Sequence, residues 1–321
     1  MRLGFLSLAA LVASAFFLAQ IPATAFADSP YSVSEVLRVR WGSGPGALGR
    51  TRPREANPEC PMSFAVDALG GLHVLDQVNF RVQSFVDGKV AASFAIPSSA
   101  FQDLALDSSG RFVLLDRLVS SSVWWFDGAG RPLQQVAIDG KGIEFAGGVT
   151  ALFPGDDGLW LEFNNGPHVR VATARMAKDD ARPVRPGRPM PDGRLLLAGI
   201  GEARDRVELA AQPAGSDPRP LVAVGFDEPV FHIDAVEVDA AGRILLAVDL
   251  LTVDPADPDR ILHETAQVVI LSSEGKVLQR LELPPLDAPE EQLRAVRLGA
   301  DGALYQLRCE EDAAVVRRIA R

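Results

Sequence analysis

The sequence predicts an all-β protein, a six-bladed β-propeller whose four-stranded antiparallel blades form a ring closed by the N-terminal strand. Three observations predict it: a repeated strand–turn–strand unit, six aligned glycines and almost no helical periodicity. The clearest copy of the unit is FAVDALGGLHVLDQVNFRVQSF at 64–85, where a Gly-Gly turn separates two apolar runs. Weaker copies follow at 103–116, 151–163, 189–199, 235–249 and 295–307.

The aligned glycines mark the turn inside each unit. They are Gly70, Gly110, Gly158, Gly193, Gly242 and Gly302. Each stands where a tight turn requires a positive φ, which glycine adopts most freely. Without residues 1–27, the six copies share 294 residues, 49 each, which is the size of a four-stranded blade. We therefore expect one propeller domain over 28–321.

The remaining strands of each blade come from a second hairpin. VQSFVDGKVAASFAI, VWWFDGAGRPLQQVAI and VVILSSEGKVLQRLEL each place a short glycine turn between two apolar strands. The Pro- and Arg-rich segment 176–193 separates the two weakest copies, and we expect it to be an inter-blade loop.

Ring closure follows from the two ends of the repeat array. The last copy stops one strand early after 313–320, and an unassigned strand at 33–41 precedes the first copy. Pairing the two would remove two exposed sheet edges. Cys60 and Cys309 would then lie on one face of neighbouring blades, where a disulfide is expected in an oxidising compartment. Two separate buried thiols are the alternative.

The first 27 residues have the pattern of a secretory signal peptide. Arg2 precedes an apolar run at 3–18, and Ala25-Phe26-Ala27 offers small residues for cleavage before Asp28. We expect export to the periplasm or medium. An uncleaved membrane anchor is the rival interpretation, because the run is almost long enough to span a bilayer. No later segment of the sequence is apolar enough to span.

Charge limits the classes of partner. Removal of Arg2 with the leader lowers the net charge from −10 to −11. A chain this acidic repels nucleic acids and anionic lipids. We expect a monomer that binds a protein, a small molecule or a carbohydrate, with no nucleic acid and, after cleavage, no transmembrane domain.

The first copy and its flank carry a family resemblance. RWGSGPGALG at 40–49, Pro61 and the unit at 64–85 are similar to the NHL-repeat family of six-bladed propellers. The resemblance covers 40–85 and implies that Asp76, Asn79 and Arg81 form a turn-and-brace, since Asp and Asn bond to nearby backbone and Arg can tie back to the Asp bidentately. The other copies are degenerate. The Gly-rich stretch is expected to be a flexible loop, because no helix follows it to bind phosphate.

A candidate site lies where the inner strands begin. Gln102, Asp234 and Arg294 occupy the same column of the aligned copies, with Asp103 and His232 close by. This column should surround one mouth of the central channel, where converging polar groups would form a ligand site. The alternative is that they only bond loop backbone and water.

Metal chemistry is the second functional hypothesis. A lactonase of the gluconolactonase type would place Glu, Asn and Asp at the channel mouth around Ca²⁺ or Zn²⁺, and here only Asp103 and Asp234 are obvious candidates. The acidic segment at 249–260, expected to be a long loop, offers Asp254, Asp257 and Asp259 as weak Ca²⁺ ligands. Its two prolines and missing EF-hand glycine favour a solvated loop. The NHL fold also includes a zinc lyase that uses several histidines and a tyrosine, and this sequence has no matching motif.

These observations favour a module that binds a ligand or a protein through the loop-rich face carrying 42–62, 226–234 and 249–263. No cofactor is predicted for it. No Ser/His/Asp, Cys-based or paired-carboxylate motif identifies a catalytic centre in the linear sequence, although such centres assemble from distant residues.

Overall fold

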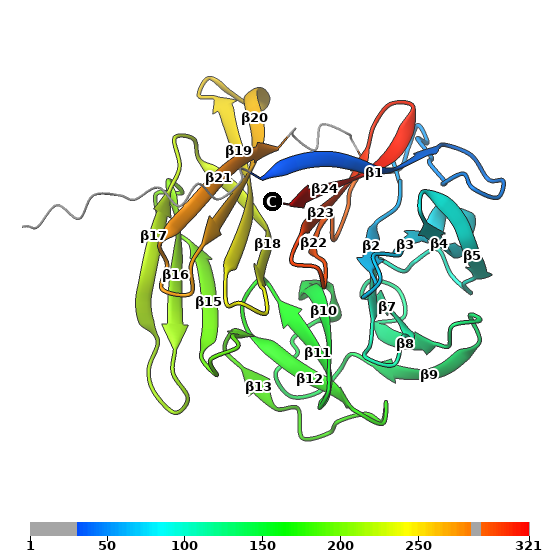
Figure 1. The fold of residues 1–321 in the computed structure, drawn as a ribbon, viewed down its shortest axis with the longest axis horizontal. Coiled ribbons are helices and arrows are strands. Elements are labelled where there is room, and N and C mark those ends of the chain that lie inside the picture. Colours follow the sequence, from blue (N-terminus) through cyan, green and yellow to red (C-terminus); the bar gives the residue numbers. More distant parts are fainter. Residues whose placement is uncertain (1–30, 284–289, 321) are drawn as a thin grey trace, which may run out of the picture.

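The computed structural model describes residues 31–283 and 290–320, except the side chains of 258 and 259. The predicted leader at 1–27 lies outside these residues. Six four-stranded antiparallel sheets follow one another around a ring, as predicted (Figure 1). No α-helix occurs in the described residues, only the short 3-10 turns η1 (Gln77–Asn79) and η2 (Ala146–Gly148).

The first three blades follow chain order from the inner strand outwards. Blade 1 contains β2 (Ser63–Val66), β3 (Leu72–Asp76), β4 (Arg81–Val86) and β5 (Lys89–Ala95). Blade 2 contains β6 (Asp103–Leu106), β7 (Phe112–Asp116), β8 (Ser122–Phe126) and β9 (Pro132–Ala137). Blade 3 contains β10 (Val149–Gly155), β11 (Gly158–Phe163), β12 (His168–Thr173) and β13 (Val184–Arg185).

The other three blades complete the ring. Blade 4 contains β14 (Arg188–Pro189), β15 (Leu195–Ile200), β16 (Arg206–Gln212) and β17 (Arg219–Gly225). Blade 5 contains β18 (Val230–Val238), β19 (Ile244–Asp254), β20 (Asp257–Leu271) and β21 (Val277–Leu283). Blade 6 contains β22 (Val296–Leu298), β23 (Leu304–Cys309), β24 (Ala313–Ala320) and the N-terminal β1 (Ser32–Arg40).

The glycine prediction is confirmed at all six turns. Each aligned glycine has a positive φ, from 72° at Gly302 to 139° at Gly158. At Gly158 a Cβ would also lie 2.1 Å from the carbonyl oxygen of Ala172, so the turn cannot hold another residue without a backbone shift. These turns fix the register of the two inner strands of every blade.

The inner strands define two faces of the ring. β2, β6, β10, β14, β18 and β22 all run in the same direction around the channel. We call the face where they begin the start face and the face where they end the end face. Apolar side chains fill the space between neighbouring blades: Val113 and Leu115 of blade 2, for example, share one core cluster with Leu161 and Val169 of blade 3.

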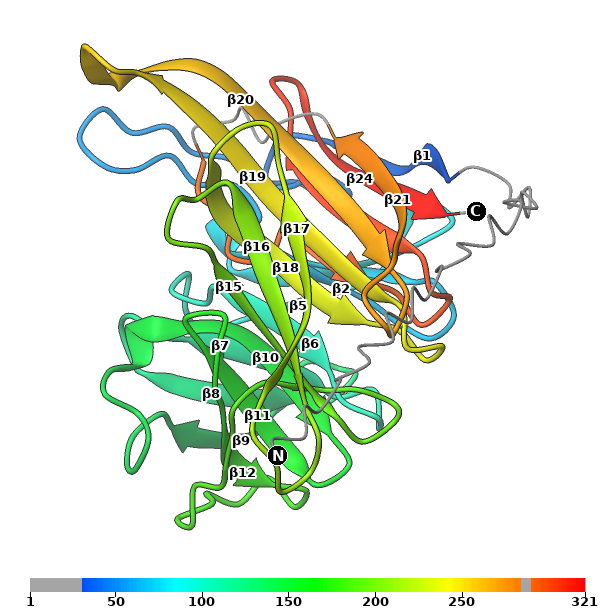
Figure 2. The same ribbon diagram turned by 90° about the vertical axis from the view of Figure 1, so that its left-hand side faces the viewer.

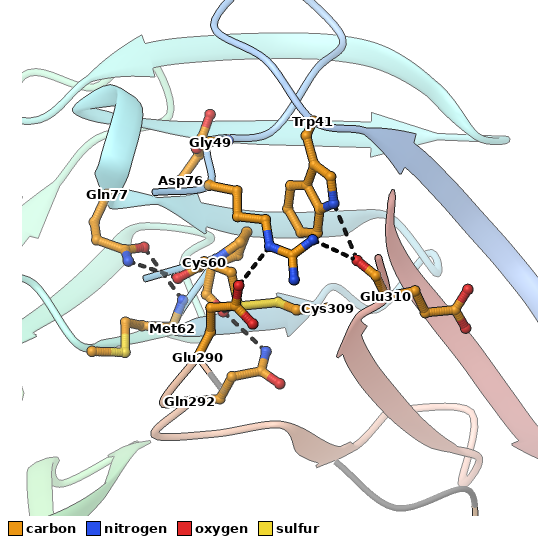
Figure 3. Close-up of a disulfide and its surroundings, with 12 residues drawn as sticks. Trp41, Gly49, Cys60, Met62, Asp76, Gln77, Glu290, Gln292, Cys309 and Glu310 are labelled. Carbon is orange, nitrogen blue, oxygen red and sulfur yellow. Dashed lines mark hydrogen bonds and ion pairs between the residues drawn. A yellow bond between two sulfur atoms is a disulfide. The ribbon is translucent and has the colours of Figure 1, made fainter. Parts of the chain in front are cut away.

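The predicted closure is confirmed. β1 pairs antiparallel with β24, from Ser32 opposite Ala320 to Arg40 opposite Ala313 (Figure 1). Cys60 and Cys309 form the predicted disulfide, with their Cα atoms 6.6 Å apart and 249 positions apart in the sequence (Figure 3). Closure of so long a loop restricts the unfolded chain strongly.

The turn-and-brace in blade 1 is present, but it does more than the resemblance implied. Arg81 Nε donates to Asp76 at 2.7 Å as the only Arg81 contact to that carboxylate, so the pair is not bidentate. The other Arg81 nitrogens bond the carbonyls of Ser43, Gly44 and Ala47. Asn79 also bonds the carbonyl of Gly42. The Gly-rich stretch is therefore pinned to blade 1 rather than a free loop.

Two expected loops contain strands. Segment 176–193 supplies β13 and β14, which are two residues long each. The acidic segment at 249–260 belongs to β19 and β20, which form a long hairpin that projects beyond the ring (Figure 2). Prolines and aspartates suggested a loop, but β-branched Thr252, Val253 and Ile261 extend the strand pairing. Among the helices of the described residues, none could cross a membrane.

Candidate functional site

A cavity of about 410 Å³ opens on the start face between blades 5 and 6. We call it the start-face pocket. The beginning of β18, the middle of β19, the segment before β22 and the end of β23 supply its walls. Its lining residues are Phe231, His232, Asp234, Asp249, Glu290, Glu291, Gln292, Leu293, Ala295, Arg308 and Cys309.

Irregular pairing of β18 brings the acidic residues together. His232 lies opposite Asp249 in the ladder, and the register shifts on both sides of it, between Val230 and His232 and between Ile233 and Ala235. Phe231 and Asp234 are therefore extra residues in two bulges. Bulges re-aim side chains and are common beside functional sites. Here Asp234 and Asp249 line one pocket, close enough for the two carboxyl groups to shift each other's pKa.

The carboxyl pair holds a proton more tightly than ordinary aspartates do. Both side chains are half-buried in the pocket wall. Desolvation raises the pKa of Asp234 well above its usual range, and the charge of Asp249 and their hydrogen bond raise it further. Desolvation also raises the pKa of Asp249, although the hydrogen bond from Asp234 and the nearby His232 oppose it. Two carboxylates this close cannot both ionise cheaply.

His232 faces the same pocket in its neutral form. Desolvation lowers the pKa of His232, and the Arg204 guanidinium adds to this, while Asp249 partly opposes the change. A neutral imidazole can accept a proton at one ring nitrogen and donate a hydrogen bond from the other. The pocket thus combines a proton-sharing carboxyl pair with an uncharged base.

The floor of the pocket is fixed to the ring seam (Figure 3). Glu290 is buried and accepts from Arg50 Nε at 2.5 Å and Arg52 Nε at 2.7 Å. Gln292 Nε2 donates to the carbonyl of Pro61 at 3.0 Å, next to the disulfide. The segment beginning at Glu290 is therefore held against the loop that contains Cys60. Glu291, by contrast, leaves its carboxylate exposed.

The five residues predicted to share the channel mouth do not all line the same pocket. His232 and Asp234 line the start-face pocket. Gln102 is buried and accepts from the backbone N–H of Arg117 at 2.9 Å. Asp103 is buried and bonds Ser63 Oγ at 2.6 Å, the N–H of Leu152 and the guanidinium of Arg297. Arg294 is buried too and donates to Glu237 at 2.8 Å. A ligand role for any of the five stays a prediction.

The weak metal candidates lie far along the projecting hairpin. Asp254 accepts from the N–H of Ala256 at 2.9 Å and pairs with Arg260, and Asp257 begins β20. The side chain of Asp259 is outside the description. Within the described part of the chain, no group of three or more His, Cys, Asp or Glu residues is arranged to hold a metal.

Sequence reasoning missed the partner of Asp234. Asp249 stood out only as one of several acidic residues in an expected loop. Regular pairing through the Gly242 turn would have placed it opposite Ile233, and the bulge at Asp234 shifts it to His232. The inner arginines Arg188 and Arg297 were also missed, because their carboxylate partners come from other blades.

No family model and no curated protein matches the chain, so the NHL likeness remains a resemblance. Solved structures do match. A member of the DUF4221 family from Bacteroides vulgatus is 9% identical, with a TM-score of 0.50 over 90% of this chain and 98% of that chain. A gluconolactonase from Xanthomonas campestris is 13% identical, with a TM-score of 0.48 over 89% and 98% of the two chains. Virginiamycin B lyase from Staphylococcus aureus is 10% identical, with a TM-score of 0.45 over 91% and 99%. Identities this low concern the fold alone, and the fold of this chain is a six-bladed β-propeller.

Proposed function

We propose that the protein is an exported binding module that takes a small organic cation into the start-face pocket. The observation that carries this proposal is that Asp234 and Asp249 lie together in the wall of a cavity of about 410 Å³, where both pKa values are raised. A carboxyl pair that retains one proton carries a single negative charge and gains a second when that proton leaves. An ammonium or guanidinium group can replace that proton and bind both carboxylates.

The surroundings of the pair suit an organic cation. Glu291 adds an exposed carboxylate at the edge of the pocket, and the carboxylate of Glu290 is already paired with Arg50 and Arg52. Phe231 has 59% of its surface exposed, and its ring can cover the apolar part of a ligand or stack on its charge. Arg308 also lines the pocket, and it comes from β23, in the wall opposite β18.

Export is part of the same proposal. The signal-peptide pattern of the sequence supports it, and so does the disulfide, because such bonds persist mainly in oxidising compartments. The ligand can be a free molecule or a basic side chain of a partner protein that docks on the loop-rich face. We propose no cofactor and no nucleic acid for this module, which would act as a monomer.

Calorimetric titration with 1,4-diaminobutane tests the proposal. Wild-type protein should bind it at one site, more tightly as pH rises through the raised pKa of the pair. Asp234→Asn keeps one carboxylate, so it should bind more weakly and lose that pH dependence. Asp234→Asn/Asp249→Asn should abolish binding. The matched control Asp254→Asn, on the hairpin tip, should behave as wild type. Folded wild-type protein that binds no diamine at millimolar concentration would refute the proposal.

A hydrolase at the same pocket is the second candidate. One observation favours it: a carboxyl pair that shares a proton provides an acid and a base side by side, with neutral His232 close by. The metal-dependent form fits less well. Within the described residues, no group of three or more His, Cys, Asp or Glu side chains is arranged to hold a metal.

Hydrolysis of glucono-δ-lactone, followed in a pH-stat with and without added Ca²⁺ or Zn²⁺, tests this second candidate. Turnover without metal that is lost in Asp234→Asn and His232→Ala would support the acid–base form. Turnover that requires the metal would support the lactonase form. No turnover in either condition, with diamine binding intact, would leave the binding module.

A further inference from the structure

We infer that a second ligand site lies on the opposite face of the ring, where Arg188 would bind a small oxyanion such as a carboxylate or phosphate. A cavity of about 230 Å³ opens there between the inner strands of blades 3, 4 and 5. We call it the end-face cavity. Its walls include Phe153, Trp160, His168, Arg185, Arg188 and Glu237. The inference goes beyond the proposed function, because it uses none of the start-face residues.

Arg188 is the central group of the end-face cavity. It is 8% exposed, and two of its nitrogens form a fork with Glu162 at 2.7 and 3.0 Å. The third nitrogen, Nη1, forms an ion pair with Glu237 at 3.6 Å, a distance too long for a hydrogen bond. It is buried without a hydrogen-bond partner among the described residues. A buried donor in this state favours a ligand that brings an acceptor.

The carboxylates around Arg188 have little capacity left. Glu162 accepts from Arg188 twice, from His168 at 3.0 Å and from Thr150 at 3.1 Å. Burial alone would raise the pKa of Glu162, but the Arg188 charge and the His168 hydrogen bond outweigh it and hold that pKa far below its usual range. Glu237 is already bonded to Arg294 at 2.8 Å.

Asp157, which lines the cavity together with Glu237, already accepts three hydrogen bonds. It accepts from Arg185 at 2.9 Å, from Arg170 at 3.2 Å and from the indole of Trp160 at 2.8 Å. The unused hydrogen-bonding capacity of the described cavity wall is therefore on the donor side. A cationic ligand would find paired carboxylates, whereas an oxyanion would find a guanidinium.

Buried positive charge continues from Arg188 into the channel behind the end-face cavity. The Phe153 ring contacts two guanidiniums, with Arg188 4.8 Å and Arg294 5.4 Å from its centroid. Arg294 Nε and Nη1 and Arg297 Nε are also buried without hydrogen-bond partners among the described residues. Burial lowers the pKa of Arg297 to about 10, and the charge of Arg294 contributes to the shift. An anion bound at Arg188 would reduce the repulsion between these buried guanidinium groups.

The cavity walls also favour a ring attached to the oxyanion. Arg185 stacks on Trp160 with its guanidinium 3.6 Å from the ring centroid, and Phe153 and Pro189 add apolar surface. Guanidinium groups recognise carboxylate and phosphate with directed hydrogen bonds and stack on flat groups. Benzoate combines both features, and inorganic phosphate presents the oxyanion alone.

Calorimetric titration with benzoate and with inorganic phosphate tests the inference. Folded wild-type protein should bind benzoate at one site and phosphate more weakly. Arg188→Lys keeps the charge but loses the fork, so benzoate affinity should fall about tenfold or more. Arg185→Gln removes the half-buried stacking arginine and should also weaken benzoate binding. If Arg188→Lys fails to fold by circular dichroism, Arg185→Gln decides the result alone.

Two controls make the result specific. Arg219→Gln removes an exposed arginine of β17 and should leave benzoate binding unchanged. Asp234→Asn, in the start-face pocket, should also leave it unchanged. The inference is overturned if wild-type protein binds neither anion at millimolar concentration, or if binding survives both the Arg188 and the Arg185 substitution. Phosphate binding without benzoate binding would keep the oxyanion site and exclude the ring.

Discussion

The two mouths of the channel are built from the same six inner strands, yet they have opposite chemistry. On the start face, desolvation and their closeness raise the pKa values of Asp234 and Asp249. On the end face, Glu162 is surrounded by donors and the neighbouring Arg188 has a nitrogen to spare. One mouth has unused acceptors and the other has unused donors.

The difference teaches where function can reside in a repeat fold. The glycine turns and the strand ladders recur around the ring, and they leave every blade similar. Bulges in β18 and the two-residue strands β13 and β14 break the repeat, and these irregular places border the two cavities. Local departures from the repeat help to shape both candidate sites, and register shifts also occur in other blades.

The largest expected effect comes from breaking the ion pair between Arg188 and Glu162 at the end face. Arg188→Leu leaves the carboxylate of Glu162 buried without its guanidinium, which should cost about 3–5 kcal/mol of unfolding free energy. Denaturant unfolding at neutral pH measures this loss. Arg219→Gln, with an exposed arginine, should change stability by less than about 0.5 kcal/mol. Equal, small effects of the two substitutions would show that the buried pair is not needed.

The next largest effect comes from removing the disulfide, which should change ligand binding at one face and not at the other. Cys60→Ser/Cys309→Ser should lower the unfolding free energy by about 2–4 kcal/mol, because the long loop is no longer closed in the unfolded chain. The bond lies beside the start-face pocket (Figure 3), so diamine affinity should fall. Benzoate affinity at the end face should stay at the wild-type value. A parallel loss at both mouths would argue that the seam stabilises the ring as a whole.

A smaller effect distinguishes the mouths by the pH dependence of stability. The pKa of Asp234 is raised on folding, so its protonation supports the fold at low pH and this support is lost as pH rises through the raised value. The pKa of Glu162 is lowered, so its contribution is present above its unfolded pKa and is lost as pH falls through the folded value.

Asp234→Asn isolates the start-face contribution. The amide carries no charge, so the variant should be more stable than wild type by about 1 kcal/mol above the raised pKa, and the difference should vanish in acid. Thermal unfolding at several pH values measures it. A variant less stable than wild type at neutral pH would mean that the ionised carboxylate of Asp234 stabilises the fold.

Much of the fold could be predicted from the sequence, and only part of the site. Gly70 and its five counterparts fix turns by a local requirement that sequence shows directly. The pairing of β1 with β24 and the Cys60–Cys309 bond followed from counting strands around a closed ring. The neighbour of Asp234 depended on bulges, and the partners of Asp103 and Arg188 came from other blades. Such contacts have no signature in one chain segment.

The shared proton of Asp234 and Asp249 is the central claim, and a carbon-13 NMR titration of the aspartate carboxyl carbons tests it most directly. Assigned through the Asp234→Asn and Asp249→Asn spectra, the Asp234 carboxyl should ionise at clearly higher pH than an ordinary aspartate of pKa about 3.9. Addition of 1,4-diaminobutane should then shift its signal to that of a carboxylate. Ionisation of both carboxyl groups over the pH range of an ordinary aspartate would contradict the account.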